Sequence, residues 1–292
     1  MMFRFFIQGF AVLLVVTGFS HIAGAADGIP AADRWSVRPL AEIARHQAPD
    51  MDRVALDRED LDRLEQGLPY RFASVQDVAI TPDDAGDWEI LPNGRTLWRL
   101  RISSRDALSL NLGFSRYWLP PEARLLVYSA AGEGRVLVFD ESDNADHGEL
   151  WTPVLVTGEV VVELEVDPAL RWQVELELSA IGRGYRFFGE DAADKAGTCN
   201  IDVVCPQGDD WREEIDSVAV YSFGASTLCT GWMTNKPAQD GTPYFMTAYH
   251  CNVRASRAPS VVVYWNFQSP TCGEQGGGSL EDSQTGSVLR AE

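Results

Sequence analysis

The 292-residue sequence predicts an all-β protein in two parts, a β-sandwich-like domain at about residues 70–188 and a second β domain at residues 196–292. Short segments of the first part alternate apolar with polar side chains, and turn residues separate them. Such alternation is typical of strands with one buried face. All five cysteines lie in the last third of the chain, which indicates a separate disulfide-bonded domain.

The N-terminus has the three parts of an export signal. Arg4 supplies positive charge, an apolar stretch covers residues 5–19, and Ala23-Gly24-Ala25 is a small-residue cleavage site. The apolar stretch is shorter than the roughly 20 residues that span a bilayer, which argues against a membrane anchor. We therefore expect cleavage after Ala25 and a secreted product without a membrane attachment.

The residues before the predicted sandwich contain one short helix. Residues 27–50 are mixed and rich in Ala and Pro, which indicates a loosely ordered lead-in. Residues 57–66 predict a helix, because the first turn is acidic and Leu61 and Leu64 share one face. Gly67 is placed to end this helix.

The strand signals begin at about residue 70. Strands are predicted at residues 97–102, 108–112, 125–128, 135–139, 160–166 and 174–178. Turn signals such as Pro120-Pro121 and Asp167-Pro168 separate them, and this spacing indicates an antiparallel sandwich. His147 lies in an acidic loop, where we expect a solvated side chain. Residues 189–198 are small, acidic and non-periodic, so they mark the domain boundary.

The chain is strongly acidic. It holds 43 Asp and Glu against 24 Lys and Arg, a net charge of −19. This charge argues against nucleic acid or an anionic membrane as a partner.

Four segments of the last third carry a family resemblance. The run Tyr244–Cys251 is an apolar strand that ends in Thr-Ala-Tyr-His-Cys, and it is accompanied by Thr198–Pro206, Cys229-Thr230-Gly231 and Val261–Cys272. In this order they resemble the bacterial lysyl endopeptidases, a branch of the trypsin-like serine proteases. The resemblance implies a pro-region at residues 26–195. It also implies that residues 196–292 are the first barrel of a chymotrypsin-like double β-barrel, with the second barrel absent.

The resemblance assigns His250 as the catalytic general base and later the general acid. Tyr249 stands where this branch often has a second histidine. No Gly-x-Ser-Gly nucleophile segment follows His250, and Asp282 lies outside the family's aspartate motif. We therefore expect a precursor truncated before two members of its triad, which should be inactive as written. It would cross the bacterial periplasm in transit, act on protein or peptide substrates, and be a monomer whose pro-domain packs on the protease domain.

The family pattern also assigns the cysteines. It pairs Cys229 with Cys251 and Cys205 with Cys272, and it leaves Cys199 without a partner in this chain. A zinc site of Cys199, Cys205, His250 and Cys251 is the competing interpretation. It is disfavoured because Cys-x5-Cys is not a metal-ligand spacing. No metal or other cofactor is expected.

Lysine usage points to a processing site. Only Lys195 and Lys236 occur, and Lys236 precedes Pro237, a bond that trypsin-like enzymes cut poorly. A lysine-specific protease that matures itself would need one cleavable lysine at the boundary, which is where Lys195 stands. A genome biased toward arginine would also deplete lysine. The alternative function is a non-enzymatic secreted binding protein, or the product of a degenerate gene, that reuses half a protease fold.

Overall fold

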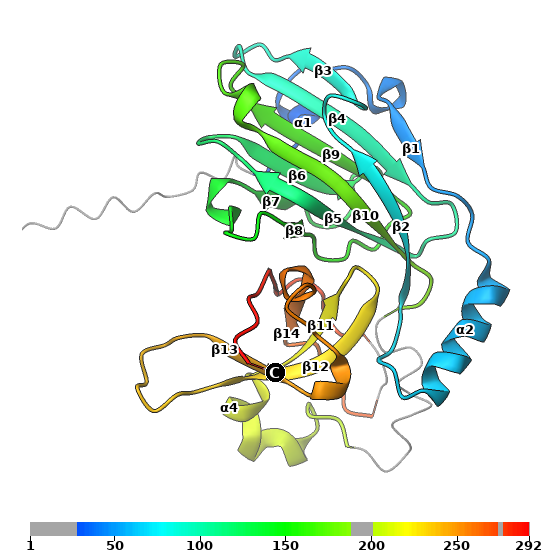
Figure 1. Cartoon of the computed structure of the whole chain (residues 1–292), viewed down its shortest axis with the longest axis vertical. Helices are drawn as coiled ribbons and strands as arrows, with labels where there is room; N and C mark the ends of the chain where they lie inside the picture. The colour runs from blue at the N-terminus through cyan, green and yellow to red at the C-terminus, as the bar shows by residue number, and fades with distance from the viewer. Residues whose placement is uncertain (1–27, 188–200, 274–276, 292) are drawn as a thin grey trace, which may run out of the picture.

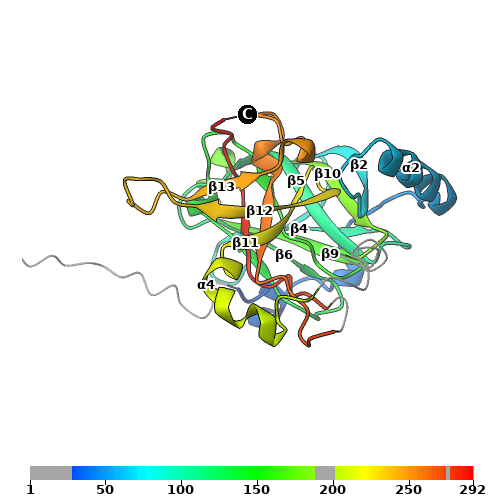
Figure 2. The ribbon, with the colours of Figure 1, turned by 90° about the horizontal axis from the view of Figure 1, so that it is seen from below.

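Three β-sheets make up most of the computed structural model, which describes residues 28–187, 201–273 and 277–291. Two of the sheets face each other as a sandwich, and the third lies below them in Figure 1. Figure 2, which views the molecule from below, shows this third sheet in front of the sandwich. The predicted all-β class is confirmed, with open sheets rather than closed barrels.

The sandwich consists of a six-stranded and a four-stranded sheet. The first has the order β1-β4-β9-β6-β7, with β3 beside β4, and the second has the order β2-β10-β5-β8. The strands of the first sheet are β1 Arg45–Gln47, β3 Asp87–Ile90, β4 Thr96–Ser103, β6 Arg124–Ser129, β7 Leu137–Phe139 and β9 Glu159–Val166. Those of the second are β2 Ala73–Ile80, β5 Ser109–Trp118, β8 Leu150–Trp151 and β10 Glu175–Gly184. The predicted strands fall on β4, β5, β6, β7, β9 and β10.

The sandwich core comes from alternate residues of these strands. Leu100 of β4 and Val162 of β9 pair across one sheet and face Leu112 and Phe114 of β5 on the other. All four side chains are almost fully buried. The period of two that is visible in β4 and β9 follows from this packing, since successive strand residues point to opposite faces.

Within the described residues, the α-helices are α1 Ala31–Arg34, α2 Arg53–Glu65 and α4 Arg212–Ile215. The predicted helix is α2, which begins four residues earlier than expected because the Asp52 side chain accepts a hydrogen bond from the Ala55 backbone N–H. Gly67 follows it with a φ of +67°. Among the described helices, none has the length and apolar character that crossing a membrane requires.

Residues 28–50 are ordered, so the expectation of a loose lead-in is wrong for them. Strand β1 pairs with β4 in parallel, and Ala31 is fully buried, with its N–H donating to Glu163 Oε1 at 2.7 Å. Arg34 forms an ion pair with the buried Glu165. These partners lie about 130 residues away in β9. The local sequence therefore carried no periodic signal of the packing.

The third sheet is built from the last third of the chain. Its order is β13-β12-β11-β14-β15, so β13 and β15 are its two edges. Its strands are β11 Val218–Phe223, β12 Thr227–Thr234, β13 Tyr244–Thr247, β14 Val262–Trp265 and β15 Ser283–Thr285. All neighbouring strands are antiparallel. This sheet stands where the sequence predicts a first barrel, in an open form.

A small apolar cluster joins the sandwich to the third sheet. Phe72 and Val154 come from the sandwich side, and Leu228 and Tyr264 come from β12 and β14. The Tyr264 hydroxyl accepts a hydrogen bond from the Val154 N–H at 3.0 Å. Burial raises the pKa of Tyr264 to about 12, so the hydroxyl stays protonated at neutral pH.

We predict that Tyr264→Phe destabilises the whole chain, because it leaves the buried Val154 N–H without this acceptor. The expected loss is about 1–3 kcal/mol, the usual cost of an unsatisfied buried donor. Urea unfolding followed by fluorescence measures it. The control is Tyr244→Phe, which removes a hydroxyl without a hydrogen bond within the described residues and should change stability by less than about 0.5 kcal/mol. Equal effects of the two variants would contradict this role of Tyr264.

Candidate active site around His250

His250 lies on a short turn that directly follows an edge strand. Strand β13 ends at Thr247, and the 3-10 turn Tyr249–Cys251 begins two residues later. The Cys251 N–H donates to the Ala248 carbonyl at 3.0 Å, and Asn252 leaves the turn with a φ of +58°. His250 is exposed, whereas Cys251 beside it is buried. The turn therefore presents the imidazole to solvent and anchors itself through its neighbour.

A disulfide between Cys229 and Cys251 ties this turn to β12. The two sulfur atoms and a ring nitrogen of His250 all lie within 4.8 Å of one another. A cysteine in a disulfide has no thiolate to offer a metal ion. This cluster is therefore a disulfide packed beside a histidine. Cys205 and Cys251 are both in disulfides, so they cannot serve as the zinc ligands of the competing interpretation.

Hydrogen bonds from the neighbouring strands hold the end of β13 in place. The Thr247 hydroxyl donates to the Thr230 carbonyl at 2.8 Å and lies 2.8 Å from the Tyr221 hydroxyl, which can donate to it. Burial raises the pKa of Tyr221, which keeps it a donor. Thr247 thus links β11, β12 and β13 at the point where the chain turns toward His250.

Arg254 supports the same turn from its exposed side. Its guanidinium donates to the Tyr249 hydroxyl at 2.9 Å and to Asn252 Oδ1 at 3.0 Å. It also lies 4.7 Å from the centre of the Tyr249 ring. Only Thr247, which belongs to the strand and turn motif, has a signal in the sequence. No short-range pattern marks Arg254 or Tyr221 as supporting residues.

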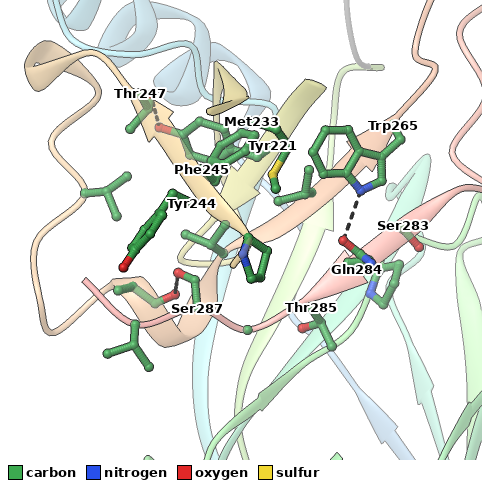
Figure 3. Close-up of a pocket in the computed structure, with 18 of the residues that line it drawn as sticks. Tyr221, Met233, Tyr244, Phe245, Thr247, Trp265, Ser283, Gln284, Thr285 and Ser287 are labelled. Carbon is green, nitrogen blue, oxygen red and sulfur yellow. Dashed lines mark hydrogen bonds between the residues drawn. The ribbon is translucent and has the colours of Figure 1, made fainter. Parts of the chain in front are cut away.

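A groove of about 1520 Å³ runs beside the site, between the two edges of the third sheet. Its wall includes Tyr221, Phe245 and Trp265, whose rings make successive edge-to-face contacts at 5.6 and 5.9 Å. Figure 3 shows β13 residues Tyr244, Phe245 and Thr247 on one side and Ser283, Gln284 and Thr285 of β15 on the other. Gly231 allows this packing, because a Cβ there would lie 2.4 Å from the Phe245 ring.

The structure places the other predicted residues as follows. A disulfide joins Cys205 to Cys272, which links the segment before β11 to the loop after β14. Asp282 is exposed and accepts a hydrogen bond from the Asn266 side chain at 2.7 Å. Within the described residues, no carboxylate forms an ion pair with His250. Ala25, Lys195 and Cys199 lie outside the described residues.

Comparisons with known proteins find the same family in both halves of the chain. The profile of the lysyl endopeptidase N-terminal domain matches residues 45–180, and that of the lysyl endopeptidase C-terminal domain matches residues 193–292. A lysyl endopeptidase of Pseudomonas aeruginosa is 26% identical over 209 residues, which are 64% of this chain and 44% of that protein. The chain thus spans about half the length of this relative.

We predict that replacing both Cys229 and Cys251 by Ala costs about 3 kcal/mol of stability, as the loop-entropy relation gives for a separation of 22 residues. The matched pair is Cys205 and Cys272, separated by 67 residues, for which the same relation gives about 4 kcal/mol. Urea unfolding of both double variants measures this. Exchange broadening or a shift of the His250 ring signals in NMR should appear only in the first double variant, since only that bond adjoins His250. A change confined to the second would contradict this assignment.

Proposed function

Because the chain belongs to the lysyl endopeptidase family, we propose that it is part of a secreted serine endopeptidase precursor that cuts peptide bonds after lysine. The observation that carries the proposal is the position of His250, which is exposed on a turn held by the Cys229–Cys251 disulfide. A rigid, accessible imidazole is what a general base needs.

In this mechanism the neutral imidazole of His250 takes the proton of a serine hydroxyl as the serine oxygen attacks the scissile carbonyl. His250 then gives that proton to the leaving amine. Residues 251–292 contain no Gly-x-Ser-Gly segment and no aspartate in the family's motif. Residues 1–292 alone are therefore proposed to be inactive, because the nucleophile and the acid that orients the imidazole are missing.

We assign the sandwich as a pro-domain that packs on the protease part. Its support is the shared cluster of Phe72, Val154, Leu228 and Tyr264, together with the Arg135 guanidinium, which donates to the Glu281 carbonyl at 2.8 Å. Export through the signal at residues 1–25, peptide substrates and a monomeric state complete the proposal. The net charge of −19 supports a partner other than nucleic acid.

Maturation is proposed to follow Lys195. The neighbouring basic residues are poorly placed for cleavage. Arg183 is buried inside β10, where its guanidinium donates to the Pro49 carbonyl at 2.6 Å. Arg186 forms ion pairs with Asp57 and Asp60 at 3.1 and 3.2 Å.

The test of the function expresses the whole open reading frame that contains residues 1–292 and assays it on lysyl peptide substrates. We predict that His250→Ala lowers kcat by on the order of a million-fold, because the general base is lost. His147→Ala, which changes a histidine of the sandwich, should keep full activity. Hydrolysis that survives His250→Ala in a folded protein would refute the assignment. A reading frame without a serine nucleophile would favour the binding-protein alternative.

The test of maturation compares Lys195→Ala with Lys195→Arg in the same expression system. A lysine-specific enzyme should leave both variants unprocessed, whereas wild type should yield a mature chain that begins Ala196-Gly197-Thr198. N-terminal sequencing of the secreted product decides between them. Normal processing of Lys195→Arg would contradict lysine specificity, and a start after Arg183 or Arg186 would contradict the site.

A further inference from the structure

The loop between β12 and β13 carries one of the two lysines of the chain. It comprises residues 235–243, and both Figure 1 and Figure 2 show it extending away from the sheets. Lys236 lies near its start, and every residue from Pro237 to Pro243 is exposed. Exposed loop tips are preferred sites of proteolytic nicking. Exposure alone would therefore make Lys236 a target for a lysine-specific protease.

The loop itself holds the ammonium group of Lys236. The Nζ atom lies 2.6 Å from Asp240 Oδ2 and 5.6 Å from the centre of the Tyr244 ring. The other carboxylate oxygen, Asp240 Oδ1, accepts hydrogen bonds from the Thr242 N–H at 3.1 Å and from the Thr242 hydroxyl at 2.6 Å. The hydrogen bond from Lys236, followed by those from Thr242, lowers the pKa of the Asp240 carboxyl. Asp240 is therefore an anion at neutral pH, fixed opposite the lysine.

The carbonyl group of Lys236 is engaged as well. It accepts a hydrogen bond from the Gln239 N–H at 3.0 Å, which closes a turn over residues 236–239. Pro237 occupies the second position of this turn, which its fixed φ favours. Gln239 and Gly241 then have φ angles of +46° and +71°, so the chain bends again directly after the turn. The peptide bond that follows Lys236 thus lies inside a closed turn rather than in an extended segment.

Cleavage after a lysine requires both of these groups to be free. In a trypsin-like enzyme the side chain before the scissile bond enters a specificity pocket, and its carbonyl oxygen binds in the oxyanion hole. In this loop the Lys236 ammonium is paired with Asp240, and its carbonyl oxygen is bonded to the Gln239 N–H. An exposed ion pair contributes little by itself. Its effect here adds to that of the turn, because a protease has to break both contacts before it can bind the lysine.

We propose that this loop withholds Lys236 from lysine-specific proteolysis, with Asp240 holding the ammonium and the turn to Gln239 holding the carbonyl. The inference rests on the proposed function in one respect, since the protease that the loop would meet most often is the enzyme itself. Strand β13 pairs only with β12, and it leads to the turn of His250. A cut after Lys236 would break the covalent link between these two strands. The loop therefore protects the support of the candidate site.

The experiment digests the folded chain with an added lysine-specific endopeptidase and follows the fragments by mass spectrometry. Every variant carries Pro237→Ala, so that the resistance of a Lys-Pro bond plays no part in the comparison. Cleavage after Lys195, the other lysine, reports the activity of the added enzyme, and all rates are divided by it. In Pro237→Ala alone we expect cleavage after Lys236 to stay slower than cleavage after Lys195.

The test of the ion pair adds Asp240→Asn to this background. The asparagine oxygen can still accept hydrogen bonds from Thr242, but no negative charge remains opposite Lys236. We expect cleavage after Lys236 to accelerate about two- to fivefold, the range for loss of an exposed ion pair. Asp240→Ala also removes the acceptor for Thr242, so its acceleration should be larger, about tenfold.

A matched variant and a change of salt are the controls. Asp282→Asn alters another exposed carboxylate of the third sheet, which accepts a hydrogen bond from Asn266, and it should leave the rate after Lys236 unchanged. Added salt screens exposed charges, so it should accelerate that cut in Pro237→Ala but not when Asp240→Asn is also present. Near-UV circular dichroism reports folding. Should Asp240→Asn unfold the chain, the salt dependence of Pro237→Ala alone decides.

The proposal is overturned if Asp240→Asn and Asp282→Asn give equal rates after Lys236, if salt has no effect on Pro237→Ala, or if that variant is cut equally fast after both lysines. The added enzyme supplies all the hydrolysis, so this outcome is separate from that of the proposed function. Faster cleavage of Asp240→Asn together with an inactive open reading frame would leave the protected loop without the protease. An active open reading frame whose loop is cut regardless of Asp240 would leave the protease without this protection.

Discussion

The Cys229–Cys251 disulfide is the constraint on which the site depends. It joins the middle of the sheet to a turn that is otherwise exposed, and it buries Cys251 next to an imidazole that faces solvent. A loop histidine without such an anchor would sample many orientations, and fewer molecules would hold the imidazole in the orientation that the proposed general base needs. The Thr247 hydroxyl, at the end of β13, adds a second anchor through its hydrogen bond to the Thr230 carbonyl. The geometry of His250 is thus set by bonds to its neighbours rather than by contacts of its own ring.

The sandwich and the third sheet depend on each other for their packing. An open sheet of five strands has two free edges and an apolar face, and such surfaces are normally covered. Here the Phe72 and Val154 cluster covers part of β12 and β14, and Arg135 reaches Glu281 beside β15. The groove beside β13 is lined from both parts, by residues such as Leu137 and Phe139 of the sandwich and Tyr244 and Phe245 of β13. The two halves matched by separate family profiles therefore share one packed boundary in the structure.

The local patterns predicted most of the sandwich. β4 and β9 alternate because their side chains point in turn to the core and to the opposite face. The alternation of apolar and polar residues did not predict that Glu163 and Glu165 are buried. Burial raises the pKa of Glu163. For Glu165 burial acts in the same direction, but Arg34, Arg124 and Arg95 outweigh it and lower the pKa. These charged pairs join residues far apart in the chain, so no window of sequence contains them.

The sequence by itself determined the all-β class, the family, the candidate histidine and the cysteines beside it, because strand periodicity and the motif around His250 are properties of short segments. Only the tertiary structure decided that residues 28–50 are packed, that the third sheet stays open, and that residues 70–72 pair with the start of β12. The physical reason is the same in each case. Backbone edges and buried charges take partners by proximity in space, and proximity arises only when the sheets assemble.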